Sequence, residues 1–309
     1  MNVPPVTAVI VTYRSADTIG TALGALRASH DAGLVRTIVV DNASDDGTAD
    51  LVRQQYPWVE VLDSGGNVGF ARGNNVALRR LDPATSGPFV LLLNPDAALA
   101  EADLRQLIEF LDARPEVGIV GPALDNRGGS PALAHPFPTP GSTLRHALGR
   151  VGNDSEAPPL IPGTPPQRVD WICGAAMLIR TSVVRALDGF DDRFFLYFEE
   201  TDLCYRAHRA GHEIWVLGEA VAVHHVHASA RTAKRELYFG CIAEHYFRSR
   251  YYYLVKHYGR VRASAVEAAT FVLTAARALA KRLRGQPPGE LLVRLRAPFL
   301  RSPERAPQS

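Results

Sequence analysis

The first 120 residues alternate between short apolar runs and longer segments in which apolar residues recur every three or four positions. The short runs are rich in β-branched residues and predict strands at Val6–Val11, Thr37–Val40, Val59–Leu62 and Phe89–Leu93. The longer segments predict helices at Asp17–Ala28, Asp46–Gln55, Gly69–Leu81 and Glu101–Ala113. This alternation is typical of an α/β fold, in which helices cover both faces of a mostly parallel sheet.

The pattern changes at residues 124–168, where proline and glycine replace the apolar periodicity. We expect a long flexible loop here, with one short helix near Ser142–Gly149. Regular patterns then return. They predict a strand at residues 169–180, a short helix at 181–190, a helix at 200–210, a strand at 213–217 and two helices after residue 231.

Charge divides the chain near Arg231. From this residue onward there are 16 Lys and Arg against 5 Asp and Glu, a net charge of +11, which leaves −9 of the overall +2 for residues 1–230. We therefore expect a domain at residues 1–230 and a basic helical C-terminal region at residues 231–309. A basic region suits an anionic membrane surface, although ordinary solvated helix faces have the same composition. No nucleic-acid-binding module is recognisable in it.

Other features indicate a cytoplasmic protein. The three cysteines, Cys173, Cys204 and Cys241, have no spacing typical of a disulfide framework. The first apolar run follows no basic region and is too short for a signal peptide. The longest C-terminal apolar stretch, around Phe271–Ala280, is shorter than the roughly 20 residues that cross a bilayer, so we expect no transmembrane helix.

Polar clusters follow the first two predicted strands. Thr12, Tyr13 and Arg14 come directly after the first strand, and Asp41 ends the second. Ligands bind at the carboxyl ends of strands in parallel sheets, and a carboxylate there can accept the ring N–H of a base. Asp41 is therefore a candidate for nucleotide recognition, although the following Asn, Ser and Asp residues are equally typical of an N-cap turn.

A glycine-rich segment, GGNVGFARGNN at residues 65–75, precedes the third predicted helix. A helix that begins near Gly69 offers free N–H groups to a phosphate, and Arg72 adds a bidentate donor. The segment is neither a P-loop nor the GxGxxG fingerprint, which argues against Walker-type NTPases and dinucleotide enzymes. A glycine turn without a ligand is the alternative interpretation.

The fourth predicted strand leads into Asn94, Pro95 and Asp96, so that Asp96 lies on a proline-fixed turn. Mg²⁺ and Mn²⁺ need only one or two carboxylates when a substrate's phosphates supply the remaining ligands. Asp96 is thus a candidate ligand for a diphosphate-bound metal. An Asx-type turn explains the motif equally well when it is taken alone.

Carboxylates crowd the segment GFDDRFFLYFEETDLCYRAHRAG, where Glu199, Glu200 and Asp202 follow four aromatic residues. Crowded carboxylates in a partly apolar cleft raise one another's pKa, which can produce a general base near neutrality. The alternative is that they are first-turn residues that favour the helix dipole. Further on, His224 and His225 have a spacing that fits no structural zinc site, and one of them is a candidate to complete the coordination of a diphosphate-bound metal.

Taken in order, these segments resemble the inverting GT-A glycosyltransferases of family 2, and within them the rhamnosyltransferase-like branch that acts on polyprenyl-diphosphate sugars. The matching segments are VIVTYRS, VVDNASDDGT, GGNVGFARGNN, LLLNPDA, GAAMLIR, GFDDRFFLYFEETDLCYR and HHVHAS. The resemblance covers most of residues 6–230. It implies an α/β GT-A fold with a Rossmann-like, mostly parallel sheet and a C-terminal helical extension. Residues 1–120 would form the nucleotide-binding half and residues 169–230 the acceptor and catalytic half.

The resemblance also implies roles for individual residues on the donor side. Asp41 would meet the nucleotide base, beside the turn that contains Thr12. Asn94-Pro95-Asp96 matches the family's DxD motif, with Asp96 as the metal ligand and Asn94 in the place of the first Asp. A metal held by so few charges is expected to arrive together with the donor. The other residues expected near the nucleotide, diphosphate and donor sugar are Tyr13, Arg14, Asn67, Gly69, Arg72 and Asn75.

On the catalytic side, Glu199-Glu200 matches the Glu-Asp motif that supplies the base in the family. Glu200 is the first choice for this role, with Glu199 and Asp202 as second choices. His224 or His225 matches the histidine that approaches the metal. Residues expected near the acceptor are Trp171, Gly174 and Phe198.

The implied function is inverting, metal-dependent transfer of a sugar from a nucleotide-sugar donor, with Mg²⁺ or Mn²⁺ as cofactor. L-Rhamnose from dTDP-rhamnose is the leading donor, and a glycan or polyprenyl-diphosphate-linked sugar of cell-envelope polysaccharide is the expected acceptor. The expected location is the cytoplasmic face of the cell membrane, through peripheral contact. We allow for a homodimer and expect no nucleic-acid partner.

Three alternatives stay open from the sequence. The enzyme could use another NDP-hexose and a different acceptor. It could be a catalytically decayed GT-A protein that binds a sugar or lipid. A nucleotidyltransferase would share the nucleotide and metal chemistry, but it would need a basic glycine-rich loop near the N-terminus, where this chain has Thr12, Tyr13 and Arg14.

Overall fold

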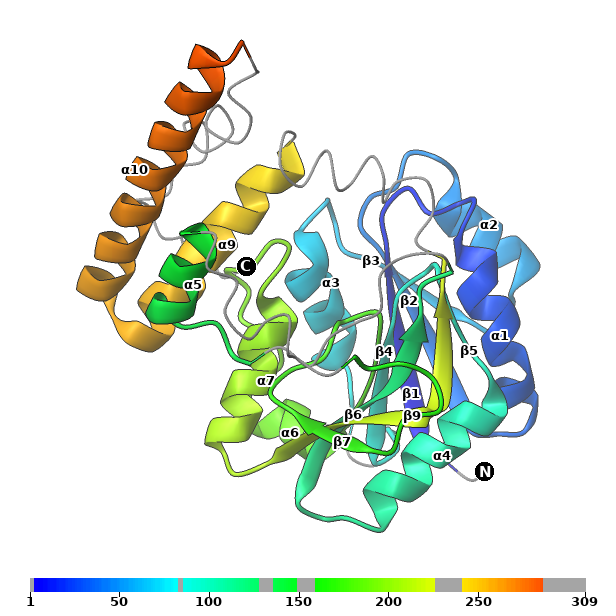
Figure 1. The fold of residues 1–309 in the computed structure, drawn as a ribbon. Coiled ribbons are helices and arrows are strands. Elements are labelled where there is room, and N and C mark those ends of the chain that lie inside the picture. Colours follow the sequence, from blue (N-terminus) through cyan, green and yellow to red (C-terminus); the bar gives the residue numbers. More distant parts are fainter. Residues whose placement is uncertain (1–2, 83–85, 128–135, 149–158, 226–240, 286–309) are drawn as a thin grey trace. The chain divides into compact units, whose positions relative to one another are not determined.

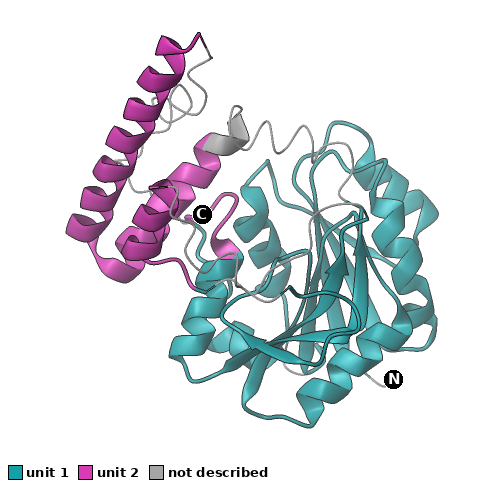
Figure 2. Ribbon diagram, in the orientation of Figure 1, with its two compact units in different colours: residues 1–136, 158–192, 200–226 teal, residues 137–157, 193–199, 227–309 magenta. Residues whose placement is uncertain are grey.

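The computed structural model describes residues 3–82, 86–127, 136–148, 159–225 and 241–285. The chain forms two compact units (Figure 2). The first, called the sheet unit here, contains residues 1–136, 158–192 and 200–226. The second, the helical unit, contains residues 137–157, 193–199 and 227–309. The division at residue 231 stays a prediction, and two earlier segments group with the C-terminal helices.

The nine strands of the described sheet unit form one mixed sheet (Figure 1). They are β1 (Val6–Thr12), β2 (Val35–Asp41), β3 (Glu60–Asp63), β4 (Phe89–Leu93), β5 (Ala97–Leu99), β6 (Val117–Asp125), β7 (Gln167–Val169), β8 (Ala176–Arg180) and β9 (Glu213–His224). Their order is β3-β2-β1-β4-β8-β6-β9-β5, and β7 pairs with β9. The first four strands pair in parallel, whereas β8 is antiparallel to both β4 and β6.

Helices cover both faces of this sheet (Figure 1). They are α1 (Ile19–Asp31), α2 (Thr48–Gln55), α3 (Gly69–Leu78), α4 (Glu101–Asp112), α6 (Thr181–Ala186) and α7 (Glu199–Arg209). Every residue of β1 and β4 is buried, as expected for strands that are covered on both sides. Leu23 of α1 and Leu107 of α4 belong to the same fully buried cluster as Ile10 and Leu91 of the sheet. The structure therefore confirms the predicted α/β class.

The register of the parallel strands places polar residues at one edge. Thr12 is paired with Asp41 at the ends of β1 and β2. Ala176, at the start of antiparallel β8, lies opposite Leu93 at the end of β4. The chain before β8 therefore reaches the same edge as the carboxyl ends of the parallel strands, which is where ligands bind in such sheets.

Residues 169–180 are not one continuous strand, and that part of the sequence prediction is wrong. Strand β7 ends at Val169 and β8 begins at Ala176. Gly174 lies between them, where an added Cβ would be 3.6 Å from the Phe70 ring and 3.9 Å from the Cβ of Glu200. The run was read as a strand because it is apolar. Its central residues are buried without strand pairing: Gly174 lies against α3 and α7, and Ile172 packs beside Gly121 of β6.

The predicted loop at residues 124–168 contains regular structure in its described part. Strand β6 continues to Asp125, and a helix, α5, covers Pro140–Ala147. Thr139 caps α5: its hydroxyl accepts the N–H of Ser142, whose side chain reaches back to the Thr139 N–H. We expected the whole segment to be flexible, and residues 128–135 and 149–158 of it lie outside the described residues.

The helical unit is built on α5, α9 (Cys241–Tyr258) and α10 (Arg260–Leu283), and α10 packs against both other helices. A buried ion pair joins α9 to α10: the Arg250 guanidinium donates to both carboxylate oxygens of Glu267 at 2.9 Å. Glu267 is completely buried, so the loss of either partner would leave an uncompensated charge. This pair fixes which face of α10 is turned toward α9.

Aromatic residues attach the segment 193–199 to α9 within the helical unit. Phe194 is fully buried, with its ring centroid 4.9 Å from that of Tyr252, and Phe195 stacks on His245 at 4.4 Å. The Ser249 hydroxyl donates to the backbone carbonyl of Leu196 at 2.8 Å. The tyrosine-rich stretch of α9 therefore holds the chain that leads directly into α7.

Among the described residues, α10 is long and apolar enough to cross a membrane by length and composition. It has 24 residues, and its most apolar window of 18 residues has a mean hydropathy of 1.3. The length expected from residues 271–280 is therefore wrong, because the helix extends well beyond them on both sides. The expectation that no helix crosses the membrane stays a prediction, since length and composition alone do not test it.

Candidate active site

The carboxyl ends of β1 and β2 form a buried polar corner around Asp41. The Thr12 hydroxyl donates to Asp41 Oδ1 at 3.0 Å, and the Ser44 N–H donates to Oδ2 at 2.9 Å. Thr12 is fully buried and Asp41 nearly so, which fixes the orientation of the carboxylate. Each carboxylate oxygen keeps further acceptor capacity for a donor such as a ring N–H.

Tyr13 and Arg14 leave this corner toward solvent. Arg14 has a left-handed backbone, with φ of 52°, and its guanidinium forms two 2.7 Å hydrogen bonds with Asp45. The hydrogen bond and charge of Asp45 raise the pKa of Arg14, and the same contact lowers the pKa of Asp45. Arg14 thus joins the loops after β1 and β2, while Tyr13 remains 45% exposed beside Asp41's corner.

The glycine-rich segment closes onto the same corner. The Asn42 side-chain amide donates to the Gly69 carbonyl at 3.0 Å, and Asn67 Oδ1 accepts the Gly69 N–H at 3.2 Å. An added Cβ at Gly73 would lie 2.8 Å from Val11, so only glycine lets α3 approach β1 this closely. The beginning of α3 is therefore held beside Asp41, as the predicted phosphate site requires.

Two polar residues of α3 differ in their surroundings. Arg72 is half-buried and has no hydrogen-bond or ion-pair partner within the described parts of the chain, which leaves its cation for a ligand. Asn75 is buried, and its amide is engaged by the protein itself. Its Nδ2 donates to the Phe190 carbonyl at 2.8 Å and to Asp192 at 2.5 Å, while its Oδ1 accepts the Phe190 N–H at 2.9 Å. Asn75 thus anchors the turn before α7, and its amide is bonded within the protein rather than directed at a donor, contrary to the expectation from the resemblance.

Asp96 and His224 come together although 128 positions separate them in the sequence. Strand β5 pairs with β9 so that Ala97 lies opposite His224. This places His224 Nε2 at 3.3 Å from Asp96 Oδ1, and the N–H of His225 donates to the Asp96 carbonyl at 3.0 Å. The side chains of His224 and Asp96 are 16% and 26% exposed, so both remain accessible from the sheet edge.

The Asp96–His224 pair fits a shared divalent cation. Ligands at adjacent corners of an octahedron with bonds of about 2.1 Å lie about 3 Å apart, close to the observed 3.3 Å. Asn126 Oδ1 lies 3.3 Å from His224 Nδ1 and can orient the ring, as outer partners of metal-bound histidines do. Within the described ranges no group of three or more His, Cys, Asp and Glu could hold a metal ion, so a diphosphate would have to supply the remaining ligands.

Glu200 lies on the sheet unit's side of the boundary, at the start of α7. Burial raises the pKa of its carboxyl group, and hydrogen bonds from the backbone N–H groups of Glu200, Gly174 and Thr201 partly oppose this shift. Its Oε2 is buried without a hydrogen-bond partner among the described residues. A carboxylate with a raised pKa and an unpartnered oxygen is suited to accept a proton. The backbone carbonyl of Ala175, the residue after Gly174, accepts the N–H of Asn94 at 2.9 Å. The chain at Gly174 and Ala175 therefore connects the surroundings of Glu200 with the turn that carries Asp96.

The other two acidic candidates have different environments. Asp202 is fully buried and accepts a 2.7 Å hydrogen bond from Arg206, whose guanidinium also donates to the carbonyls of Leu187 and Gly189. This pair stabilises the turn before α7 and leaves Asp202 little capacity for a substrate proton. Glu199 is buried and belongs to the helical unit. Successive residues of a helix point about 100° apart, so Glu199 and Glu200 face different surroundings.

The expected acceptor residues are distributed over both units. Gly174 contacts Phe70 and Glu200 in the sheet unit, and Trp171 is half-buried in the chain leading to it. Phe198 belongs to the helical unit, where its ring lies 5.5 Å from Tyr246 and 5.6 Å from Tyr253. Phe198 has a φ of 67°, and this left-handed turn directly precedes α7.

Sequence reasoning missed several residues that shape the site. Asn126 beside His224 and Phe70 beside Gly174 carried no motif of their own. Arg206 was given no role, yet its position four residues after Asp202 is a signal for a helical ion pair. His227 and Ser229 of the histidine motif lie outside the described residues.

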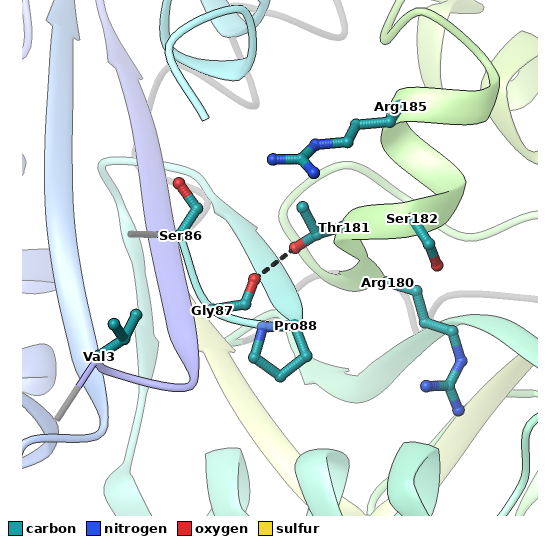
Figure 3. A pocket seen from close by; sticks show the side chains of 8 residues that line it. All are labelled: Val3, Ser86, Gly87, Pro88, Arg180, Thr181, Ser182 and Arg185. Atoms are coloured by element: carbon teal, nitrogen blue, oxygen red, sulfur yellow. Dashed lines mark hydrogen bonds between the residues drawn. The ribbon is translucent and has the colours of Figure 1, made fainter. Parts of the chain in front are cut away.

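A cavity of about 550 Å³ lies at the opposite edge of the sheet (Figure 3). It is lined by residues near the start of β1 and β4 and the end of β8, among them Val3, Ser86, Arg180 and Arg185. The Arg180 guanidinium donates to the backbone carbonyls of Leu111, Arg114 and Val117, so its charge is already used in packing. Because the cavity lies at the amino ends of β1 and β4, it is separate from the cluster of Asp41, Asp96 and Glu200 at the carboxyl ends of the parallel strands.

With this geometry established, comparison with known proteins identifies the family. A family model described as "Glycosyltransferase like family 2" matches residues 4–241. The chain therefore belongs to this family of glycosyltransferases, as the ordered motifs predicted.

Two relatives and one solved structure refine this assignment. The low-salt glycan biosynthesis hexosyltransferase Agl10 of Haloferax volcanii is 31% identical over 220 residues, which cover 70% of this chain and 66%, just under two thirds, of that protein. The N-acetylglucosaminyl-diphospho-decaprenol L-rhamnosyltransferase of Mycobacterium tuberculosis is 28% identical over 74% of this chain and 78% of its own length. These similarities agree with the rhamnosyltransferase-like branch.

The mannosyltransferase PcManGT of Pyrobaculum calidifontis, solved with GDP-Man and Mn²⁺, has a TM-score of 0.57 at 19% identity. The match covers 91% of this chain and 76% of that one. It confirms the GT-A fold with its C-terminal helices.

Proposed function

We propose that this protein is an inverting glycosyltransferase that transfers L-rhamnose from dTDP-rhamnose to a hydroxyl of a lipid-linked glycan during the assembly of cell-envelope polysaccharide. The observation that carries the proposal is the convergence of three pairs at one edge of the sheet: Thr12 with Asp41, Asp96 with His224, and Gly174 with Glu200. A nucleotide site, a diphosphate site and a proton acceptor are the parts that glycosyl transfer from a nucleotide sugar needs.

The nucleotide would bind at the corner formed by Asp41. Its carboxylate is held by Thr12 and Ser44 and can accept the N–H of a pyrimidine ring. Tyr13 offers an exposed ring beside this corner for stacking. Thymine and uracil each carry such a ring N–H, so a dTDP-linked sugar agrees with this corner.

The diphosphate would lie between the beginning of α3 and the Asp96 turn. Arg72 and the N–H groups at the start of α3 would hold its oxygens, with the loop shaped by Asn67 and Gly69. Asp96 and His224 would hold a Mg²⁺ or Mn²⁺ ion against the same oxygens, while the N–H of His225 fixes the backbone of Asp96. When bound, this cation would supply charge that stabilises the departing nucleoside diphosphate.

Glu200 would take the proton from the acceptor hydroxyl as that oxygen attacks the anomeric carbon. Its raised pKa and its Oε2, buried without a hydrogen-bond partner among the described residues, support this role, and the Arg206 contact removes Asp202 from it. Glu199 stays the second choice. A single displacement of this kind inverts the configuration at the anomeric carbon. Gly174 leaves space beside Glu200 for the acceptor, with Trp171 close by in sequence.

The acceptor is proposed from the mycobacterial relative, whose name gives a decaprenyl-diphosphate-linked sugar as its substrate. An acceptor of this kind lies at a membrane, so we propose that the protein works at the cytoplasmic surface of the cell membrane. The basic C-terminal region, with a net charge of +11 from residue 231 onward, supports attraction to anionic lipids.

A donor panel tests this function. The purified full-length chain is incubated with Mn²⁺ and dTDP-rhamnose, UDP-glucose, UDP-N-acetylglucosamine or GDP-mannose, with a short prenyl-diphosphate N-acetylglucosamine as acceptor, and nucleoside diphosphate release is measured. The proposal expects the fastest acceptor-dependent release from dTDP-rhamnose. Preference for another donor would replace the sugar but keep the reaction, and no release or binding with any donor would favour a decayed site.

A further inference from the structure

The surface of α10 carries an exposed apolar stripe. Its large members are Val261, Val272, Leu279 and Leu283, which are 84%, 64%, 61% and 82% exposed. With 3.6 residues per turn, these positions fall within about 40° of arc around the helix axis. Three exposed alanines, Ala265, Ala268 and Ala276, extend the same stripe. The result is a continuous apolar surface about 30 Å long on a helix with 1.5 Å rise per residue.

The stripe is outward because the opposite face of α10 is already occupied. The buried positions of the helix are Ala263, Glu267, Thr270 and Ala278, and α9 and α5 pack against α10. Glu267 accepts both hydrogen bonds from Arg250, and Ser264 lies 3.0 Å from the hydroxyl of Tyr251. These polar contacts specify the rotation of α10 about its axis, so the apolar stripe is a property of the folded helical unit.

The exposed charges of α10 all have one sign. Glu267 is the only acid between residues 260 and 284, and it is buried in the ion pair. The exposed charged residues are Arg260, Arg262, Arg277, Lys281, Arg282 and Arg284. Arg262 and Arg282 flank the stripe, each about 80° around the helix axis from its centre, whereas Arg277 and Lys281 lie on the far side. An apolar stripe with a cation on each flank is complementary to a bilayer surface with anionic headgroups and is less suited to a neutral protein groove.

The same residues argue against a spanning arrangement. A helix that crossed the bilayer would place Arg277 within the hydrocarbon region and would need to lose its contacts with α5 and α9, or carry the Arg250–Glu267 pair into lipid. A helix that lies along the surface keeps the pair in the protein and lets the long cationic side chains extend to the headgroups.

We propose that α10 binds an anionic lipid bilayer in the plane of its surface, with Val272 and Leu279 inserted between the headgroups. This inference rests on the proposed membrane location of the enzyme and names the surface responsible. It explains why the four most exposed large apolar side chains of the described residues all lie on one face of α10.

Flotation of the purified full-length protein with phosphatidylcholine vesicles that contain about one third phosphatidylglycerol tests the proposal. Replacing Val272 and Leu279 together by serine leaves the charge and the buried face unchanged. Two inserted side chains are lost, so the partition coefficient is expected to fall at least roughly 30-fold. Ala280→Ser, at an exposed position of α10 outside the stripe, is the matched control and should change binding less than about threefold.

The outcomes separate the possibilities. The proposal would be overturned if the double variant bound vesicles as well as the wild type does. A double variant that no longer forms dimers but binds vesicles unchanged would overturn it as well, because the stripe would then be a protein interface. Protein that stays with the vesicles after an alkaline carbonate wash would overturn the in-plane arrangement in favour of a spanning helix. Nucleoside diphosphate release is measured separately with a water-soluble acceptor. The double variant should keep it, and a protein without transferase activity would still give a vesicle-binding result.

Discussion

Replacement of Glu200 by glutamine is expected to affect activity and stability in opposite directions. Glutamine has the same shape, and its carbonyl can still accept the backbone N–H of Gly174 and Thr201 that the carboxylate accepts. It cannot take a proton from an acceptor hydroxyl. A positioned general base contributes about 10²–10⁴-fold to the rate, so kcat should fall by that factor, equivalent to about 3–5 kcal/mol in the activation barrier.

The stability effect follows from the raised pKa of Glu200. Below its ordinary value of 4.5 the carboxyl group is protonated in both the folded and the unfolded chain. As the pH rises above this value, the unfolded chain ionises first, and the folded state loses stability until the pH passes the folded pKa. The variant lacks this loss. Its melting temperature should therefore exceed that of the wild type at pH 8, and the difference should shrink toward pH 4.5.

The assay combines three measurements on the same preparations: kcat at saturating donor and acceptor, donor affinity by calorimetry, and thermal unfolding at several pH values. Glu199→Gln is the matched control, because it removes the neighbouring charge of α7, and its kcat should stay within about tenfold of the wild type. Near-normal turnover of Glu200→Gln would refute the assignment. The reverse pattern, with Glu199→Gln inactive, would transfer the role to the neighbouring residue.

Three further variants test other parts of the site. Asp41→Asn replaces the acceptor proposed for the base, so nucleotide affinity measured by calorimetry should fall about 10–100-fold, and equal binding of both forms would contradict the base contact. Asn126→Ala removes the partner of His224, and Mn²⁺ affinity in the presence of dTDP should fall at least roughly tenfold, whereas metal-free dTDP binding should not change. Asn75→Ala leaves the buried Phe190 N–H without its acceptor and should lower the free energy of unfolding in urea by about 2–4 kcal/mol; a loss below 0.5 kcal/mol would contradict its anchoring role.

The parallel half of the fold was predictable because its strands are buried on both faces and read as β-branched runs between helical periods. Strand β6 was missed since Gly118, Gly121 and Pro122 interrupt its pattern. An added Cβ at Gly121 would lie 2.8 Å from the Ile172 side chain, so this glycine reflects packing between segments that no local window contains. Strand β5 has only three residues, too few for any periodicity.

The candidate site divides in the same way. Asp41, Asp96 and Glu200 stand out in the sequence because each follows or begins a regular element in a polar cluster. Their partners do not. The contact of His224 with Asp96 depends on the register of β5 and β9, and the contact of Asn75 with Phe190 joins residues 115 positions apart. Chemistry could be assigned to residue types from the sequence, but whether an amide faces a ligand or the protein is decided by tertiary packing.

The configuration of the transferred sugar tests the central claim most directly. The full-length chain is incubated with dTDP-rhamnose, Mn²⁺ and the prenyl-diphosphate acceptor, and the anomeric signals of the donor and of the first product are compared by NMR before any isomerisation. A single displacement with Glu200 as the base predicts a product of the opposite anomeric configuration, formed only when both donor and acceptor are present. A product that keeps the donor's configuration would contradict this account.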